Sequence, residues 1–177
     1  RAVSYDELPS TIKRLRASKI SLPTQLALEF LILTACRTTE VLGAQWNEVD
    51  LDDKLWVIPA IRMKSGKAHE VPLTERMTSV LRHAATLNVG GDFVFPSGIS
   101  GRPLSNNTLR QALQKRLEVD ATVHGMRSAF KDWAAETTNY ANEVSEMALG
   151  HVISNKVEAA YRRGNLLNKR RQLMDDW

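Results

Sequence analysis

Two cationic side chains, His124 and Arg127, stand three residues apart in a stretch with the apolar spacing of a helix. Residues three apart share one helix face, so this imidazole and guanidinium can meet a single anionic group. A solvated pair on a surface helix has the same spacing and is the commoner case. His151 follows Gly150, a residue that ends a helix, and can either contact an anion or satisfy the last carbonyl groups.

Arg37 directly follows an apolar run, and Glu40 stands three residues further on. A guanidinium at the end of a buried element needs an anionic partner. Glu40 can be that partner, or it can orient Arg37 toward a third group. Tyr161 offers a phenol as a nucleophile, but its spacing from Val157 and Ala160 fits a packed aromatic ring better.

Helices should position most of these groups. Ser4 and Glu7 have the spacing of a capping box, which predicts a first helix at the start of the chain. Residues 25–35 are apolar on nearly every face, as in a helix buried at the centre of a domain. A short helix capped by Thr38 or Thr39 should follow. Further helices are expected from Ser105 to about residue 117 and over residues 75–87, 124–136, 142–149 and 154–162, and the last segment, residues 166–177, places apolar side chains against a basic face.

The apolar period changes to two between residues 49 and 73, which predicts three antiparallel strands with Pro72 at an edge. The second connection, residues 60–68, is a basic hairpin tip that carries Lys64. The acidic cluster at Asp50, Asp52 and Asp53 fits a hairpin turn better than a two-metal site. The expected fold class is α+β, mainly α-helical with a small three-stranded antiparallel sheet.

Composition limits the function classes. The 177 residues are 43% hydrophobic and 25% charged, with a net charge of +4 and a pI near 9.4, as in a basic globular domain. Without a membrane-length apolar run or a signal peptide, we expect a cytoplasmic protein. The single cysteine, Cys36, should be a buried thiol. Basic residues gather at Arg62, Lys64 and Lys67, at Arg110, Lys115 and Arg116, and at Arg162, Arg163, Lys169, Arg170 and Arg171.

The order of these residues along the chain resembles the tyrosine recombinase and phage integrase family. The family's first arginine box is similar to Thr34-Ala35-Cys36-Arg37-Thr38-Thr39-Glu40 followed by Trp46, and its lysine to Lys64 before Val71-Pro72-Leu73. Its second box is similar to His124-Gly125-Met126-Arg127, and its third to Leu149-Gly150-His151. Its nucleophile is similar in position to Tyr161. Ala35 replaces a usual glycine, and Met126 a usual aromatic residue or leucine. The resemblance covers essentially the whole chain and is greatest to prophage and genomic-island integrases.

The resemblance implies site-specific DNA recombination by transesterification, for prophage or genomic-island integration and excision. Tyr161 would attack the scissile phosphate, form a 3′-phosphotyrosine and free a 5′-hydroxyl. Ionising a phenol at neutral pH costs roughly 4 kcal/mol, so His124 is expected to accept its proton. The remaining roles fall to Arg37 and Arg127 on the nonbridging oxygens, His151 as a further donor, Lys64 as the general acid and Glu40 in support of Arg37.

The same resemblance implies no metal and no cofactor. The expected partners are double-stranded DNA attachment sites, other integrase protomers in a tetrameric synapse and accessory DNA-bending proteins, with no membrane. Residues 1–177 would form the catalytic domain of a longer integrase whose N-terminal DNA-binding domains are absent. Residues 166–177 could cap this domain or reach a neighbouring protomer.

Three other functions stay open. A type IB topoisomerase would nick and close one duplex, a catalytically silent DNA-binding module would form no covalent adduct, and a metal-dependent nuclease would be inhibited by a chelator. The sequence has no cysteine pair and no His-Glu-x-x-His motif, which counts against the nuclease.

Overall fold

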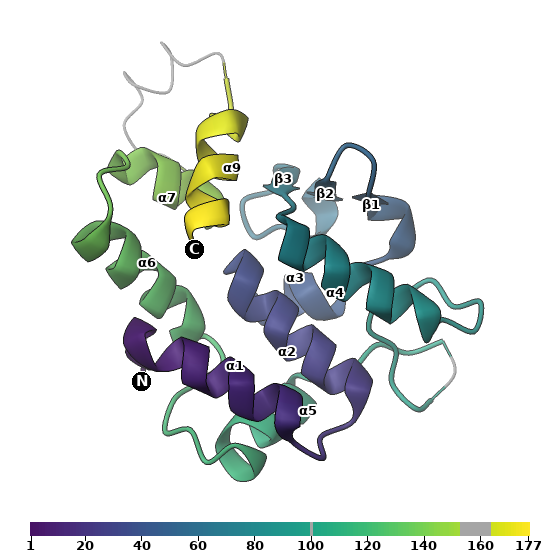
Figure 1. Ribbon diagram of the computed structural model, residues 1–177. Helices are drawn as coiled ribbons and strands as arrows, with labels where there is room; N and C mark the ends of the chain where they lie inside the picture. Colours follow the sequence, from purple (N-terminus) through teal and green to yellow (C-terminus); the bar gives the residue numbers. More distant parts are fainter. Residues whose placement is uncertain (100, 153–163) are drawn as a thin grey trace.

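The computed structural model describes residues 1–99, 101–152 and 164–177 (Figure 1). It confirms a mainly helical fold with one three-stranded antiparallel sheet. The helices are α1 (Leu8–Ala17), α2 (Leu22–Thr34), α3 (Thr38–Leu42), α4 (Glu75–Thr86), α5 (Asn106–Gln111), α6 (Gly125–Thr137), α7 (Asn142–Ala148) and α9 (Leu167–Asp176), and the strands are β1 (Val49–Asp50), β2 (Leu55–Ile58) and β3 (His69–Pro72). No helix in these ranges is long and apolar enough to cross a membrane.

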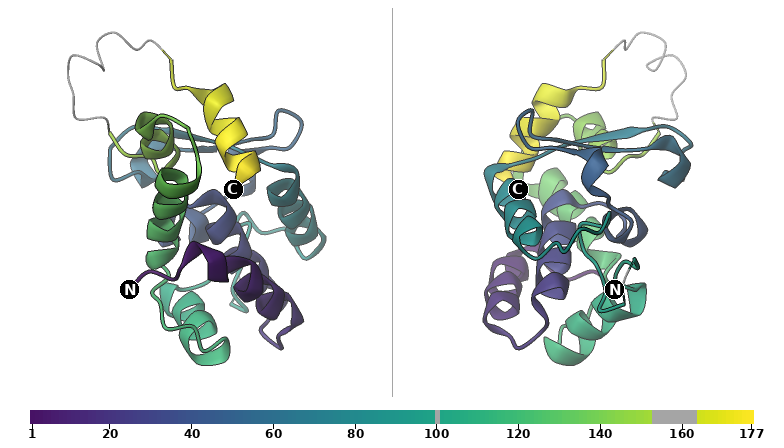
Figure 2. Two further views of the ribbon diagram at one scale, coloured as in Figure 1. Left: turned by 60° about the vertical axis from the view of Figure 1, so that its left-hand side comes forward. Right: turned by 90° about the vertical axis from the view of Figure 1, so that its right-hand side faces the viewer.

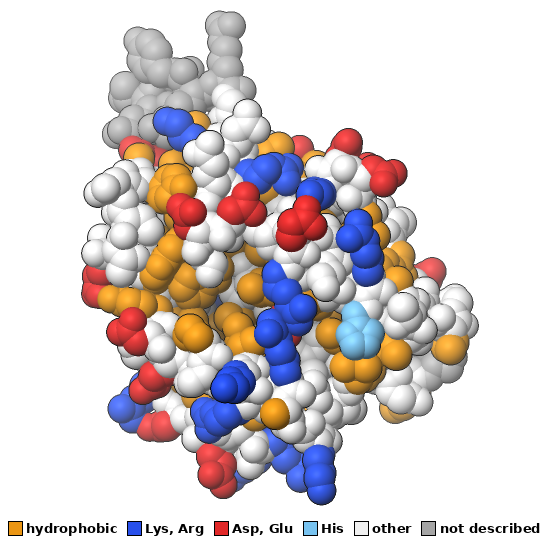
Figure 3. All heavy atoms as spheres, viewed as in Figure 1, with side chains coloured by type: hydrophobic (Ala, Val, Ile, Leu, Met, Phe, Trp, Pro, Cys, Tyr) orange, Lys and Arg blue, Asp and Glu red, His pale blue; other side chains and the backbone are white. Residues whose placement is uncertain are grey.

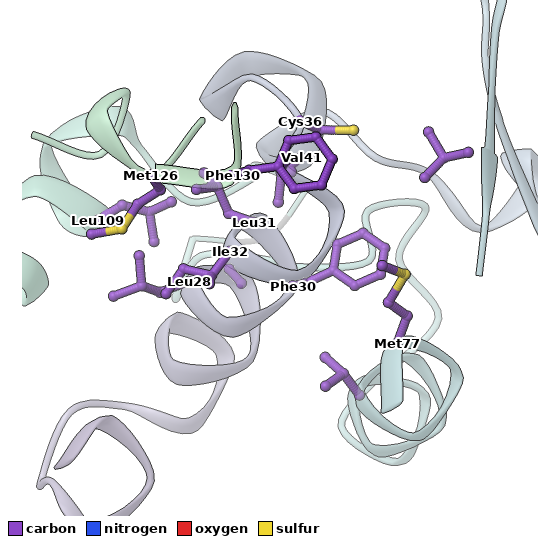
Figure 4. Close-up of a cluster of buried hydrophobic side chains, with 14 of the residues drawn as sticks. Leu28, Phe30, Leu31, Ile32, Cys36, Val41, Met77, Leu109, Met126 and Phe130 are labelled. Carbon is purple, nitrogen blue, oxygen red and sulfur yellow. The ribbon is translucent and has the colours of Figure 1, made fainter. Parts of the chain in front are cut away.

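Helix α2 forms the centre of the core, as its all-round apolar pattern predicts. It contacts α1, α3, α4, α5 and α6, so every face of the helix meets another element. Figure 4 shows Phe30 on the side of Met77 from α4, and Leu28 on the side of Leu109 from α5. All four side chains are fully buried. Burying each one contributes roughly 1.5–3 kcal/mol to folding.

The sheet lies across one end of the helical body, with α9 beside it (Figure 2). Its order is β1-β2-β3, and Trp56 in the central strand pairs with Val49 on one side and Val71 on the other. Pro72 lies in the edge strand β3, where its missing N–H removes no essential ladder bond. The backbone N–H of Asp53 donates to Asp50 Oδ1 at 2.9 Å, which confirms that the acidic cluster forms a turn.

The hairpin tip is less basic than predicted, because Arg62 folds inward. Its Nε donates to Glu48 Oε1 at 3.0 Å, and its Nη1 donates to the backbone oxygen of Glu40 at 2.9 Å. Arg62 therefore ties the β2–β3 connection to α3. Lys64 and Lys67 remain exposed around Gly66, which takes the left-handed conformation of the turn (φ 68°).

Helix starts were predicted less well than helix existence. Ser4 makes no side-chain cap; its backbone oxygen accepts from Glu7 N in a 3₁₀ turn, so the predicted capping box is wrong. The cap of α3 is Arg37, one residue before the predicted threonines. Helix α2 begins at Leu22, because Pro23 fits the first turn of a helix. Ser105 caps α5 as predicted, with Oγ accepting from Thr108 N at 3.2 Å.

The C-terminal helix caps the core of its own chain. Trp177 Nε1 donates to the backbone oxygen of Ile32 in α2 at 2.9 Å, and its ring lies 5.4 Å from Phe130 and 5.0 Å from Trp133. Arg170, expected on a basic outer face, is buried: Nη1 donates to the backbone oxygen of Glu70 at 2.6 Å and Nε to that of Asn165 at 2.8 Å. The predicted helix over residues 154–162 lies outside the described residues.

A buried carboxylate joins three helices. Glu29 in α2 is 2% exposed and accepts hydrogen bonds from Arg16 of α1 at 2.5 Å and Arg76 of α4 at 2.7 Å. Burial alone would raise the pKa of Glu29, but the bonds from the two arginines outweigh it and hold that pKa below its ordinary value. The carboxylate form therefore stabilises the fold above the unfolded-state pKa, and this stability is lost as the pH falls through the folded-state pKa.

Glu29→Gln should therefore lower the free energy of unfolding by about 1–2 kcal/mol at pH 7, since both arginines are half exposed and their attraction is screened. The difference from wild type should shrink as the pH falls through the folded-state pKa of Glu29, because the carboxylate becomes protonated there. Urea denaturation at pH 7 and pH 3.5 measures both effects. Glu75→Gln, which breaks an exposed pair with Lys54, is the matched control and should change little. Equal stability of Glu29→Gln and wild type at pH 7 would contradict the account.

Candidate active site

Arg127 is the structural centre of the candidate site. It lies in the first turn of α6, is 5% exposed, and donates from Nη1 to the Ala35 oxygen at 2.6 Å and from Nη2 to the Leu149 oxygen at 2.9 Å. Nη2 also lies 3.2 Å from His151 Nε2. Burial, and then the nearby charge of Arg37, lower the pKa of Arg127, but an arginine remains charged at neutral pH. A desolvated cation is thus held between the ends of α2 and α7.

The backbone oxygen of Ala35 accepts a hydrogen bond from Arg127. It ends α2 with φ 51° and ψ 22°, a left-handed conformation that costs an L-residue roughly 1–2 kcal/mol. Glycine takes this conformation freely, which explains why glycine is usual at this position in the family that the sequence resembles. The second departure, Met126, is fully buried and packs in the core. Neither departure displaces a charged group.

Glu40 is the partner of Arg37, as one of the two sequence interpretations proposed. Its Oε1 accepts from Arg37 Nη1 at 2.8 Å, and its Oε2 accepts from the Arg37 backbone N–H at 2.8 Å. Glu40 is 2% exposed, whereas the Arg37 side chain is 25% exposed. The buried carboxylate therefore fixes a guanidinium that still reaches solvent.

Cys36, which directly precedes Arg37, is a buried thiol as predicted. Burial raises its pKa to about 12, and the charge of Glu40 adds to that effect. The thiol is therefore neutral at physiological pH, which makes it a poor nucleophile.

His151 follows Gly150, whose φ of 66° turns the chain after α7. Its Nε2 faces Arg127, and its Nδ1 lies 2.6 Å from Glu146 Oε2. The structure thus brings Arg127 and His151 into contact, with Arg37 close enough for its charge to affect Arg127. The sequence analysis did not identify Glu146, although this residue stands only five positions before His151, in the helix that precedes it.

Two other predicted residues, His124 and Lys64, are exposed to solvent. His124 is exposed at the start of α6, where its backbone oxygen accepts from Arg127 N at 3.1 Å, so the two residues share one helical turn. Lys64 is exposed on the β2–β3 connection. Within the described ranges, no side-chain hydrogen bond joins either residue to Arg37, Arg127 or His151. Tyr161 lies outside the described residues.

A pocket of about 280 Å³ lies between His151 and the hairpin that carries Lys64. Ser65, Lys67 and His69 line it from the hairpin side, and Arg170 from α9. His69 is buried, and its Nε2 lies 3.2 Å from the Ala148 oxygen. Burial lowers the pKa of His69 to about 4, so this histidine is neutral at pH 7. His83 is exposed on α4.

A larger groove of about 990 Å³ lies elsewhere, lined by apolar residues that include Leu8, Trp133 and Trp177. Figure 3 shows hydrophobic side chains gathered in a hollow among α1, α6 and the C-terminus. Of the candidate catalytic residues that the structure describes, none lines it. In the part of the chain that the structure describes, no group of three or more His, Cys, Asp or Glu residues could hold a metal ion.

The geometry suits an anion that carries charge on several oxygens. The Arg127 guanidinium and the His151 imidazole meet where α2 and α7 end and α6 begins, and the charge of Arg37 acts on Arg127; fixed donors of this kind stabilise charge that develops on phosphoryl oxygens. This arrangement is chemically suited to bind an anion such as a phosphate.

Comparison with known proteins identifies the family. The Phage integrase family model matches residues 1–166. Prophage integrase IntA of Escherichia coli strain K12 is 35% identical over 179 residues, which cover 99% of this chain and 43% of IntA. The chain therefore spans less than half the length of this relative.

Solved structures agree on the fold. A lambda integrase dimer bound to a COC′ core site matches with a TM-score of 0.67 at 18% identity, over 88% of this chain and 59% of that one. A lambda integrase tetramer bound to a Holliday junction matches with a TM-score of 0.66 at 18% identity, over 88% and 48%. These matches confirm the catalytic-domain fold that the motifs implied, and the family match confirms the resemblance itself. The chain belongs to the phage integrase family.

Proposed function

We propose that this chain is the catalytic domain of a tyrosine site-specific recombinase that integrates and excises a prophage or genomic island. It would cut and rejoin double-stranded DNA through a 3′-phosphotyrosine. The observation that carries this proposal is the buried Arg127 guanidinium, held in contact with His151 and close to Arg37. Membership of the phage integrase family supports it.

In the proposed reaction, the scissile phosphate takes a place beside Arg127 and His151, and Arg37 binds it from the α3 side. Arg127 uses two N–H groups on backbone carbonyls, which fix the plane of its guanidinium before DNA arrives. Tyr161 attacks the phosphorus, His124 accepts the phenol proton and Lys64 gives a proton to the leaving 5′-oxygen. Each strand cut is reversed when a 5′-hydroxyl attacks the phosphotyrosine, so no outside energy source is needed.

The proposed partners are DNA attachment sites and further copies of the integrase. The lambda integrase structures support them, since one is a dimer on a core site and the other a tetramer on a Holliday junction. We extend to this chain a tetrameric synapse, accessory DNA-bending proteins and work in the cytoplasm, where chromosomal DNA lies.

A supercoiled plasmid that carries two cognate attachment sites tests this function. Purified protein should exchange the segment between the sites, and the yield should be unchanged by EDTA because Arg37, Arg127 and His151 supply the electrostatic stabilisation. Relaxation that needs no second site would instead support the topoisomerase reading. Loss of all cleavage in EDTA would support a metal-dependent nuclease.

A further inference from the structure

Glu146 contacts His151 in the candidate site but has no role in the reaction proposed above. It lies in the last turn of α7, and its two carboxylate oxygens have different partners. Oε2 lies 2.6 Å from His151 Nδ1, and Oε1 lies 2.6 Å from Lys131 Nζ of α6. Lys131 also donates to Ser145 Oγ at 2.8 Å. The carboxylate is therefore held on one side and directs the imidazole on the other.

These contacts fix the protonation pattern of the ring. Burial raises the pKa of Glu146, but the bonds from Lys131 and His151 outweigh it and leave that pKa below its ordinary value. An ionised carboxylate only accepts hydrogen bonds, so His151 Nδ1 must carry a proton. A guanidinium only donates, so Nε2 of the same ring must present its lone pair to Arg127. The DNA-free ring is thus the Nδ1–H tautomer.

A phosphate oxygen that enters beside Arg127 needs a donor from His151, and Nε2 must then take up a proton from the solvent. The resulting imidazolium keeps Nδ1–H on Glu146, and the carboxylate balances the new positive charge. The same carboxylate would otherwise disfavour a DNA site, because a negative charge near a phosphate repels it. Its place behind the imidazole is explained if it acts through His151.

We propose that Glu146 is a positioning residue that orients His151 toward the scissile phosphate and balances its charge, while Lys131 holds Glu146 in place. This inference rests on the proposed function. It adds to that function a relay of three groups: the Glu146 carboxylate contacts the His151 imidazole, which in turn contacts the Arg127 guanidinium beside the phosphate.

Cleavage of a nicked suicide DNA substrate tests the relay. Glu146→Ala should cleave about 10- to 100-fold more slowly, as when other histidines lose their orienting carboxylate, while the Kd for uncleaved DNA changes less than about twofold. Glu136→Ala, which removes an equal charge from an exposed position bonded to Tyr5, is the matched control and should cleave at the wild-type rate. A carboxylate that acted only by repelling DNA would give the opposite sign, with faster cleavage by Glu146→Ala.

A double-mutant cycle separates orientation of His151 from general damage to the fold. In a His151→Ala background, Glu146→Ala should cause no further loss beyond about twofold, because the ring it serves is gone. Losses that multiply in the double variant, or an unimpaired Glu146→Ala, would overturn the proposal.

The ring itself gives a readout that does not require cleavage. The ¹⁵N NMR signals of His151 should show the Nδ1–H tautomer in wild type and a shift toward Nε2–H in Glu146→Ala. Identical His151 signals in the two proteins would overturn the positioning role, even in a protein that forms no covalent adduct. An absent adduct in wild type together with the expected tautomer shift would count against the proposed function alone.

Discussion

Replacing Arg127 by alanine should slow DNA cleavage by about a hundredfold or more, as loss of a preorganised transition-state donor does in other enzymes. The structure gives two reasons for so large an effect. The guanidinium is buried and already oriented by the Ala35 and Leu149 carbonyls, so its attraction for a phosphate is little screened by water. It also holds His151 at 3.2 Å, so its removal disturbs a second donor.

Stability has to be separated from catalysis in this variant. Arg127→Ala leaves two buried carbonyl groups without their partner, which should cost about 1–3 kcal/mol of unfolding free energy. Arg170→Ala is the matched control, because Arg170 is equally buried and also bonds two backbone carbonyls. Both variants should lose comparable stability in urea denaturation, but only Arg127→Ala should lose about a hundredfold in single-turnover cleavage under conditions where both stay folded. A similar small loss in both would remove Arg127 from the reaction.

Tyr161→Phe should abolish the covalent protein–DNA adduct while leaving noncovalent DNA binding unchanged. The substitution removes one oxygen, the proposed nucleophile, and keeps the aromatic ring. Gel electrophoresis under denaturing conditions measures the adduct, and a mobility-shift assay measures binding. An adduct formed by the phenylalanine variant would show that another residue attacks the phosphate.

The two other tyrosines of the chain provide matched controls. Tyr5 Oη donates to Glu136 at 2.8 Å, and Tyr140 Oη donates to Asp176 at 2.6 Å. Each hydrogen bond to a carboxylate raises the pKa of its phenol, which makes these hydroxyls harder to ionise. Tyr5→Phe and Tyr140→Phe should therefore form the adduct as wild type does.

Sequence periodicity correctly predicted the helices and strands that are determined by their own pattern of apolar residues. The all-round apolar pattern predicted α2 and its place in the core, and the change to a period of two predicted the three strands. The start of α3 was missed by one residue, because its cap is made by the backbone of Arg37 bonded to the Glu40 carboxylate. The preference of threonine for helix N-caps does not predict such a hydrogen bond.

The fate of individual arginines could not be read from the sequence. Arg62, Arg127 and Arg170 all point inward and bond backbone carbonyls of segments distant in sequence. Composition treats them like the surface arginines around them, since burial depends on how separate elements meet. The order of motifs along the chain did identify the family. Contacts such as Lys131 with Glu146 became visible only when α6 and α7 were placed together.

The central claim is that Tyr161 is the residue that becomes joined to DNA, served by the cluster around Arg127. Trapping the protein on a nicked suicide substrate, followed by nuclease and protease digestion and mass spectrometry of the linked peptide, tests it most directly. The account predicts a single nucleotide-bearing peptide modified at Tyr161 through a 3′-phosphate. Modification at any other residue, or a DNA cut with no protein attached to either end, would contradict it.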